Sequence, residues 1–319
     1  MKSICLFCSY YNSPNVPNYV QYYLKELTKH FSKVVFITNE KEVSKYSLSF
    51  LEAYKIEPFL VSNEGYDFGM WYKAILKYDV EQYDRVGLVN DSCILFKPLD
   101  DYFNWLNKQD LDYAGMIDST EIIYHIQSYF LTINKNAIKP TVDFFKQHGL
   151  QANREEVIKL YELGLCKHLQ DMGLKTGAWY SSEKYFSKYN SSVHSAHAII
   201  KDGFPMIKKK IIFNSFSQQE YREIMHQSFK RNYYRIFKHH PNYYIKQIKR
   251  ANEGTTLFDF NLLRADGYNP DVKKIYSLQF LSFYHHIYKT MYYSLQFVYR
   301  FLGLRALRHK LKPSSIAND

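Results

Sequence analysis

RVGLVNDSCILFKPL, residues 85–99, joins a strand pattern to a polar ending. Apart from Arg85, its first five residues are apolar or Gly and are typical of a buried strand, which then runs directly into Asn90, Asp91 and Ser92. A carboxylate at the end of a buried strand is costly unless it is solvated, paired or bound to a metal. Two interpretations therefore stay open for this segment alone: a plain Asx turn, or the edge of a ligand site.

The residues before this strand alternate between strand and helix patterns. Short apolar runs at residues 3–8, 33–39 and 57–63 are typical of buried strands, and apolar residues recur at helical spacing between residues 20 and 31. A further helix is expected over about residues 69–78. This order predicts an α/β fold, a Rossmann-like mixed sheet with helices on both faces. In such sheets ligands bind beyond the carboxyl ends of the strands.

The middle of the chain continues the alternation. Its pattern predicts two strands, residues 111–118 and 128–134, followed by a helix over residues 136–148. A longer helix is expected over about residues 154–172, and Gly173 ends it.

Positive charge is concentrated in the last third of the chain. The 319 residues carry a net charge of +11, and residues 201–319 hold 21 Lys and Arg against 8 Asp and Glu. After Pro205 the pattern turns helical, Tyr-rich and basic. We therefore predict two regions, residues 1–213 and residues 214–319, that meet different partners.

The second region alternates aromatic residues with Lys and Arg. This pattern favours a peripheral anchor on an anionic membrane surface. A helical subdomain that caps the first region, or a homodimer interface, is the alternative. No RRM, KH or zinc-finger signature accompanies the basic residues, so we expect no nucleic-acid partner.

The four cysteines favour a reduced, cytoplasmic protein. Cys5 and Cys8 form a CxxC pair inside an apolar strand pattern, and no second pair matches it, so buried thiols are favoured over zinc or redox chemistry. The N-terminal apolar run is too short for a signal peptide. No stretch of 18 apolar residues predicts a transmembrane helix.

A glycine-containing loop, NEGYDFG, precedes the helix expected near residue 69. Gly65 and Gly69 allow the backbone to turn tightly and to approach a ligand. Asp67 lies between them, either as a helix N-cap or as an acceptor for the hydroxyls of a bound ribose, with Asn63 beside it. No GKS or GKT and no GxGxxG spacing is present, which excludes Walker and dinucleotide loops.

The NDS ending of the fourth strand suits a hard divalent cation. Mg²⁺ and Mn²⁺ prefer oxygen ligands, and one or two protein carboxylates often suffice when phosphate oxygens complete the shell. Asp91 is the candidate metal ligand, and Asn90 is a candidate contact for the ligand.

The two motifs together resemble those of A-type nucleotide-sugar glycosyltransferases, in which a polar loop and helix precede a strand ending in Asp-x-Asp. Here Asn90 and Ser92 replace the outer carboxylates. Downstream, HIQSYF at residues 125–130 and GFPMIK at residues 203–208 add to the resemblance. Over about residues 2–213 the chain is similar to the rhamnan synthesis protein F family, bacterial proteins that build rhamnose-containing polysaccharides and lipopolysaccharide O-chains.

This resemblance implies an A-type glycosyltransferase, peripheral at the cytoplasmic face of the cell membrane. It would move rhamnose or another hexose from a nucleoside-diphosphate donor to a growing surface polysaccharide or O-antigen on a lipid carrier. Mn²⁺ or Mg²⁺ at Asp91 would stabilise the departing diphosphate, and the displacement would invert the anomeric carbon. The alternatives are a sugar-phosphate transferase and an inactive scaffold that binds sugar nucleotides or membrane.

A transferase needs a base for the acceptor hydroxyl. In A-type enzymes an acidic residue commonly opens a helix that ends in glycine, and Glu162 has this position before Gly173. A solvent-facing helix Glu is the alternative interpretation. Asp118 and Glu121, which precede HIQSYF, are the other candidates for the base or for holding acceptor hydroxyls.

Further polar residues are candidates for binding. His125 and Gln127 would share one face of a strand and orient an acceptor or a phosphate. Ser9, Tyr10 and Tyr11 end the first strand, where a base could stack.

Three late residues complete the set. The resemblance implies a late His at the metal or diphosphate, and His194 and His197 are the candidates. No HExxH spacing suggests a zinc protease. Lys208 could neutralise the leaving diphosphate, unless the lysines at 208–210 are a surface run.

Overall fold

The structure is a computed structural model that describes residues 1–10, 14–39, 42–185 and 190–209. The basic region predicted at residues 214–319 lies outside the described residues. Its roles and the boundary that precedes it therefore stay predictions.

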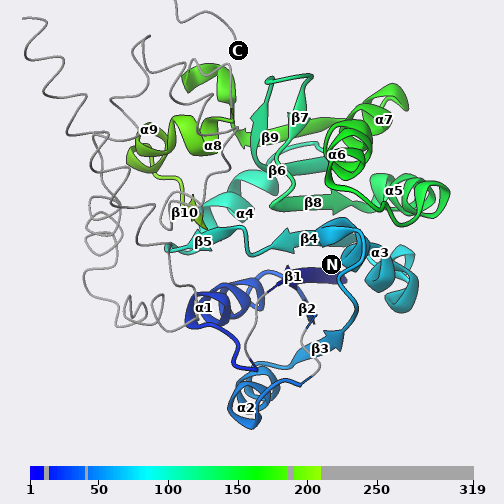
Figure 1. Cartoon of the computed structure of the whole chain (residues 1–319). Coiled ribbons are helices and arrows are strands. Elements are labelled where there is room, and N and C mark those ends of the chain that lie inside the picture. The colour runs from blue at the N-terminus through cyan, green and yellow to red at the C-terminus, as the bar shows by residue number, and fades with distance from the viewer. Residues whose placement is uncertain (11–13, 40–41, 186–189, 210–319) are drawn as a thin grey trace, which may run out of the picture. The chain divides into compact units, whose positions relative to one another are not determined.

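A mixed sheet of eight strands runs through the described part of the chain (Figure 1). Its strands are β1 (Ser3–Ser9), β2 (Lys33–Thr38), β3 (Ile56–Leu60), β4 (Arg85–Asn90), β6 (Tyr113–Ser119), β7 (His125–Ile126), β8 (Phe130–Asn134) and β9 (Thr176–Tyr180). Their order is β3-β2-β1-β4-β8-β6-β7, with β9 beside β6. The first four strands of this order run parallel, and β8 runs antiparallel between β4 and β6.

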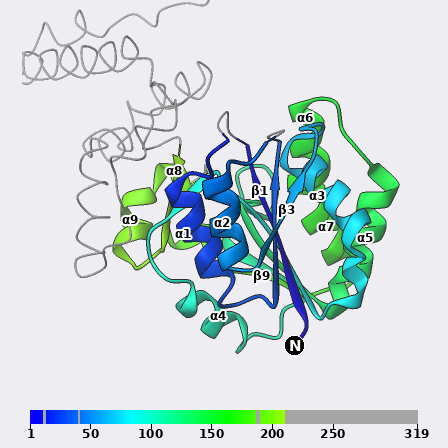
Figure 2. The same cartoon turned by 90° about the horizontal axis from the view of Figure 1, so that it is seen from below.

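Helices cover both faces of the sheet, as the sequence predicts (Figure 2). One face carries α1 (Asn18–Leu27), α2 (Lys45–Ala53), α4 (Asp100–Leu106), α8 (Ser191–His194) and α9 (Ala196–Lys201). The other face carries α3 (Tyr66–Tyr78), α5 (Lys135–His148), α6 (Arg154–Val157), the π-helix η2 (Ile158–Gly164) and α7 (Leu165–Asp171). Short 3-10 turns are η1 (Val80–Gln82) and η3 (Ser182–Tyr185). A separate two-stranded sheet pairs β5 (Cys93–Leu95) with β10 (Met206–Lys208).

Strand β1 shows why the predicted strands are apolar throughout. Ile4, Leu6 and Cys8 enter the core beneath α3 and α5, whereas Cys5 and Phe7 enter the core beneath α1. A strand covered on both faces buries every side chain, which removes the alternation of a half-exposed strand.

The same geometry decides the role of the CxxC pair. Cys5 and Cys8 face opposite sides of the sheet, and all four cysteines are buried and free. The prediction that these thiols are buried is confirmed.

Parallel pairing places several polar strand ends at one edge of the sheet. β1 and β4 are parallel neighbours, so Ser9 and Asn90 end at the same edge. β6 pairs antiparallel with β8, which itself pairs antiparallel with β4, so the carboxyl end of β6 lies at this edge too. The predicted polar edge is therefore present.

Several predicted boundaries are wrong. β3 ends at Leu60 rather than at residue 63, α3 begins at Tyr66 rather than near residue 69, and β8 begins at Phe130 rather than at residue 128. The helix predicted over residues 154–172 is interrupted by a π-helical segment. Hydrogen bonding to distant segments, which local patterns do not record, decides such ends.

The predicted turn to helix directly after Pro205 is also wrong. Residues Met206–Lys208 form β10, which pairs antiparallel with β5. A strand of three residues is too short to show a period of two. No helix among the described residues is long and apolar enough to cross a bilayer.

Gly69→Ala should lower the free energy of unfolding, measured by urea denaturation, by about 2 to 4 kcal/mol. A Cβ at this position would lie 1.8 Å from the carbonyl oxygen of Glu64, so the loop before α3 would have to move. Gly177→Ala is the control, because its Cβ would meet only the side chain of Leu111, at 3.0 Å, which can rotate. Equal losses for the two variants would contradict a backbone constraint at Gly69.

Candidate functional site

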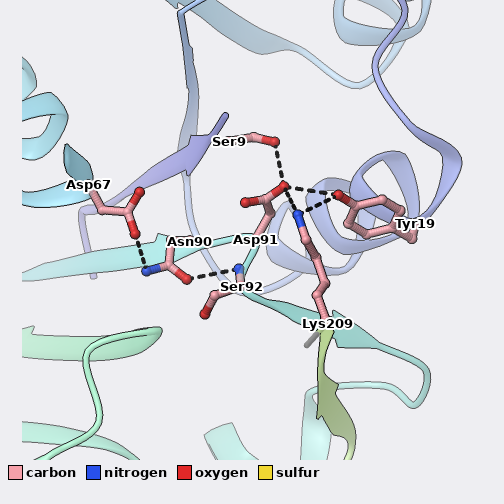
Figure 3. Close-up of polar contacts among 7 residues, drawn as sticks. All are labelled: Ser9, Tyr19, Asp67, Asn90, Asp91, Ser92 and Lys209. Carbon is pink, nitrogen blue, oxygen red and sulfur yellow. Dashed lines mark hydrogen bonds and ion pairs between the residues drawn. The ribbon is translucent and has the colours of Figure 1, made fainter. Parts of the chain in front are cut away.

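Asp91, one residue beyond β4, is the centre of a polar cluster (Figure 3). Its Oδ2 accepts hydrogen bonds from Ser9 Oγ at 2.9 Å and from the Tyr19 hydroxyl at 3.0 Å. The same oxygen lies 2.9 Å from Nζ of Lys209, which also donates to the Tyr19 hydroxyl at 3.0 Å. Asp91 is buried, and an ammonium compensates its charge.

Four separate segments supply this cluster. Ser9 ends β1, Tyr19 lies in the first turn of α1, and Asp91 follows β4. Lys209 follows β10, and its backbone N–H donates to the carbonyl of Ser92 at 2.8 Å. The pairing of β10 with β5 therefore brings the end of the described chain back to the strand end predicted from NDS.

A second acidic group lies beside the first. Asn90 Nδ2 donates to Asp67 Oδ2 at 2.7 Å, and Asn90 Oδ1 accepts from the backbone N–H of Ser92 at 3.0 Å. Gly65, with a φ of 76°, is the N-cap of α3, so the alternative interpretation of Asp67 as the N-cap is wrong. Asp67 instead lies in the first turn of the helix and faces Asn90 (Figure 3).

The electrostatics of this edge act most strongly on Asp67. Burial and the nearby carboxylates of Asp91 and Glu162 raise the pKa of Asp67 to about 7, although Lys209 and Lys208 act in the opposite direction. Three carboxyl groups and two ammonium groups therefore share one small region.

Glu162 lies within the π-helix η2 and is partly buried, so it is not the solvent-facing residue of the alternative interpretation. Its Oε1 accepts a hydrogen bond from Ser128 Oγ at 3.1 Å. Short π-helical segments occur frequently at functional sites. The position and the contact agree with the predicted base, and the role itself stays a prediction.

The other two acidic candidates have different surroundings. Asp118 is buried near the end of β6, and its Oδ1 accepts from the backbone N–H of Ser182 at 2.6 Å. Glu121 is exposed, and its backbone N–H donates to Ser119 Oγ at 3.3 Å. Asp118 thus anchors η3 to the sheet, and the roles predicted for both residues stay untested.

His125 and Gln127 lie together, as their spacing predicts. His125 Nε2 is 3.2 Å from Gln127 Nε2, and His125 Nδ1 is 2.9 Å from the carbonyl oxygen of Ile123. Each ring nitrogen of His125 therefore has a polar partner, which fixes the orientation of the ring. Gln127 Oε1 accepts from Asn190 Nδ2 at 2.7 Å. Both side chains are buried and oriented.

Lys208 is partly buried at the same edge rather than part of a surface run. Its Nζ lies 3.5 Å from Ser92 Oγ and 4.1 Å from the centre of the Tyr129 ring. This location agrees with its predicted contact to a diphosphate.

The remaining candidates are less constrained. Asn63 is exposed, and Tyr10 is 51% exposed beyond the end of β1. Tyr11 and the side chains of His194 and His197 lie outside the described residues. The binding roles predicted for all five stay predictions.

Sequence patterns missed Tyr19 and Lys209. Tyr19 has the helical spacing of a core residue, and Lys209 belongs to a run of three lysines that a surface segment would also show. The signal that would have identified Lys209 is the pairing of MIK with CIL, which joins two very short strands.

The fit of a divalent cation can be judged at Asp91. Within the described residues, one group of three metal-ligating side chains lies close together, formed by Glu26, His30 and Asp100. Glu26 is near the C-terminal end of α1, whereas Tyr19 is near its N-terminal end. At Asp91 the oxygen that would bind a cation already contacts an ammonium. The residues as they lie fit an ammonium better than Mn²⁺ or Mg²⁺, and the predicted metal stays a prediction.

Comparisons with known proteins place these residues in a wider context. The family model described as rhamnan synthesis protein F matches residues 34–295. Virulence protein VirA of Vibrio anguillarum is 24% identical over 290 residues. The match covers 75% of this chain and 90% of VirA.

Two solved structures are distant likenesses. The glycosyltransferase GlyE of Streptococcus pneumoniae TIGR4 is 14% identical, with 77% of this chain and 64% of that chain covered and a TM-score of 0.39. A cytidylyltransferase from Leptospira borgpetersenii serovar Hardjo-bovis is 13% identical, with a TM-score of 0.35. The match covers 63% of this chain and 95% of the cytidylyltransferase chain.

Asp67→Asn should stabilise the protein more at pH 8 than at pH 5. The ordinary pKa of 3.8 rises to about 7 in the fold, so between these values the folded state holds a proton that the unfolded state releases. The stability contribution of Asp67 therefore falls as pH rises through this window and is lowest above pH 7. Thermal unfolding at both pH values measures the difference between variant and parent.

Asp143→Asn, on the exposed side of α5, is the control. It should change the melting temperature by the same amount at both pH values. A pH-independent effect of Asp67→Asn would contradict the electrostatic account of this site.

Proposed function

Because the chain belongs to the rhamnan synthesis protein F family, we propose that it is a glycosyltransferase that uses a nucleoside-diphosphate sugar. The observation that carries this proposal is the convergence of Asp67, Asn90, Asp91 and Lys208 beyond the carboxyl ends of β1 and β4. Open α/β sheets bind nucleotides at this edge.

The donor would be held by complementary groups on this edge. Asp67 and Asn90 offer an acceptor and an amide for ribose hydroxyls, and the Gly65 turn lets the backbone approach them. Lys208 would contact the diphosphate, and Tyr10 or Tyr11 would stack on the base. Rhamnose or another hexose is the proposed sugar.

Glu162 is the proposed base. The acceptor oxygen forms a bond to the anomeric carbon as the bond from that carbon to the β-phosphate oxygen breaks. The acceptor proton moves to the Glu162 carboxylate, and the bonding electron pair leaves with the nucleoside diphosphate. Ser128, which donates to Oε1, holds the carboxylate in place.

The acceptor is proposed to be a growing surface polysaccharide or O-antigen on a lipid carrier. His125 and Gln127, fixed by Asn190, would orient its hydroxyls. Residues 214–319 would hold the protein at the cytoplasmic face of the membrane, with a homodimer as the alternative role. A divalent cation at Asp91, Mn²⁺ or Mg²⁺, remains part of the sequence-based prediction.

A donor screen tests the proposal. The full chain would be incubated with dTDP-rhamnose and with the UDP- and GDP-linked hexoses, plus a membrane lipid extract as acceptor. We expect one donor to release a nucleoside diphosphate. Glu162→Gln should lower kcat about 10² to 10⁴-fold and leave the Kd for the nucleoside diphosphate nearly unchanged.

Glu155→Gln, an exposed carboxylate in the first turn of α6, is the matched control and should keep full activity. Release of a nucleoside monophosphate would indicate sugar-phosphate transfer instead. Full activity of Glu162→Gln would remove Glu162 as the base. Donor binding without any release would support a scaffold.

The product should have the anomeric configuration opposite to that of the donor. A single displacement, with Glu162 as base and no covalent intermediate, requires this inversion. The coupling constant of the anomeric proton in the NMR spectrum of the product distinguishes the two outcomes. A retained configuration would rule out the single displacement.

A further inference from the structure

We propose that Lys209 is a further catalytic residue, which together with Lys208 supplies the positive charge that neutralises the leaving diphosphate. On this proposal the reaction needs no divalent cation at Asp91. The inference rests on the proposed glycosyl transfer and specifies what stabilises its leaving group.

The ammonium of Lys209 lies where the cation is predicted. Lys209 Nζ lies 2.9 Å from Asp91 Oδ2, which is the carboxylate predicted to hold a cation. It also contacts the Tyr19 hydroxyl at 3.0 Å. A divalent cation on the same oxygen would lie within a few ångströms of this ammonium and would be repelled by it.

Lys209 is also accessible to a ligand. The side chain of Lys209 is 26% exposed and that of Asp91 is 11% exposed, so the lysine side chain is the more accessible of the two. An ammonium has three donors, and the contacts with Asp91 and Tyr19 take two. The geometry accommodates a bond from Lys209 to a phosphate oxygen while Asp91 keeps the ammonium oriented.

Two positive charges lie together at the strand end. Lys208 and Lys209 are consecutive, and both reach Ser92 or its neighbour Asp91. Two ammonium groups carry the same charge as one Mg²⁺ or Mn²⁺. Both lysines oppose the rise in the pKa of Asp67, in keeping with their positions beside this strand end.

The pairing of β5 with β10 fixes the two lysines. Lys208 pairs with Cys93 in the β5–β10 register, and the backbone N–H of Lys209 donates to the carbonyl of Ser92 at 2.8 Å. This pairing holds the lysine pair before any ligand binds. Preorganised charge costs no rearrangement when the diphosphate departs.

The chemistry balances without another reactant. When the bond from the anomeric carbon to the β-phosphate oxygen breaks, its electron pair stays on that oxygen. The two ammonium groups offset the added negative charge through hydrogen bonds and keep their protons. The acceptor proton moves to the proposed base, Glu162.

The test measures binding and turnover separately. Titration calorimetry with UDP, GDP, CDP and dTDP, in Mn²⁺ and in EDTA, gives the Kd for the full chain. We expect EDTA to change the Kd of the bound nucleotide less than about two-fold. Lys209→Met should weaken binding at least about ten-fold in EDTA, as loss of a charge-assisted hydrogen bond does. Lys209→Arg should restore most of it.

Lys201→Met is the matched control, because Lys201 is an exposed lysine at the end of α9. It should leave the Kd unchanged. Thermal unfolding of each variant checks that it is folded. If Lys209→Met does not fold, the comparison of Lys209→Arg with the parent still tests the role of the positive charge. Turnover with the donor found in the screen should survive EDTA in the parent.

The outcomes separate the two proposals. Loss of binding or turnover in EDTA would overturn the role of Lys209 as the replacement for a cation and leave the glycosyltransferase proposal standing. Equal nucleotide affinity of Lys209→Met and the parent would also overturn it. Absence of nucleotide binding under every condition, together with absence of donor cleavage, would overturn the proposed function itself.

Discussion

The parallel pairing of β1 with β4 brings the residues of the site together. It aligns Cys8 with Asn90, and the backbone N–H of Asp91 continues the contact by donating to the carbonyl of Cys8 at 3.1 Å. Because the two strands run in the same direction, the segments that follow them leave the sheet at one edge. Ser9 and Asp91 become neighbours for this reason, although they lie far apart in sequence.

Charge balance follows from this crowding. Asp91 follows the end of β4, Asp67 lies in the first turn of α3 and Glu162 lies within η2. The cost of their proximity appears as a raised pKa of Asp67. Lys209 compensates Asp91 directly, and Asn90 binds Asp67 through a neutral amide. Charges stay in such a partly buried place only when each has a partner.

Sequence reasoning predicted the parts of the fold that depend on local patterns. Buried strands show as apolar runs because both faces of the sheet are covered, and Asp91 stands out because a charge follows such a run. The Asp67 and Glu162 candidates came from the spacing of glycines and from resemblance to a family. Their presence at one edge agrees with the topology that the alternation of elements implies.

The parts that depend on distant pairing could not be predicted. Lys209 reaches Asp91 only because three residues of β10 pair with three residues of β5, and neither strand is long enough to show a periodic pattern. The π-helical turn around Glu162 differs from an α-helix in hydrogen bonding, not in residue type. Tyr19 is indistinguishable in sequence from the core tyrosine Tyr23 four residues later.

The burial of the cysteines has a practical consequence. Burial raises the pKa of the Cys93 thiol to about 11 and that of Cys8 well above its ordinary value, so neither forms appreciable thiolate at neutral pH. Cys8 precedes Ser9 and Cys93 follows Ser92, yet both thiols are buried. A thiol reagent would reach them only in molecules whose strands have separated. The rate at which such a reagent labels the chain therefore reports how often the fold opens, and the protein carries its own probe of unfolding.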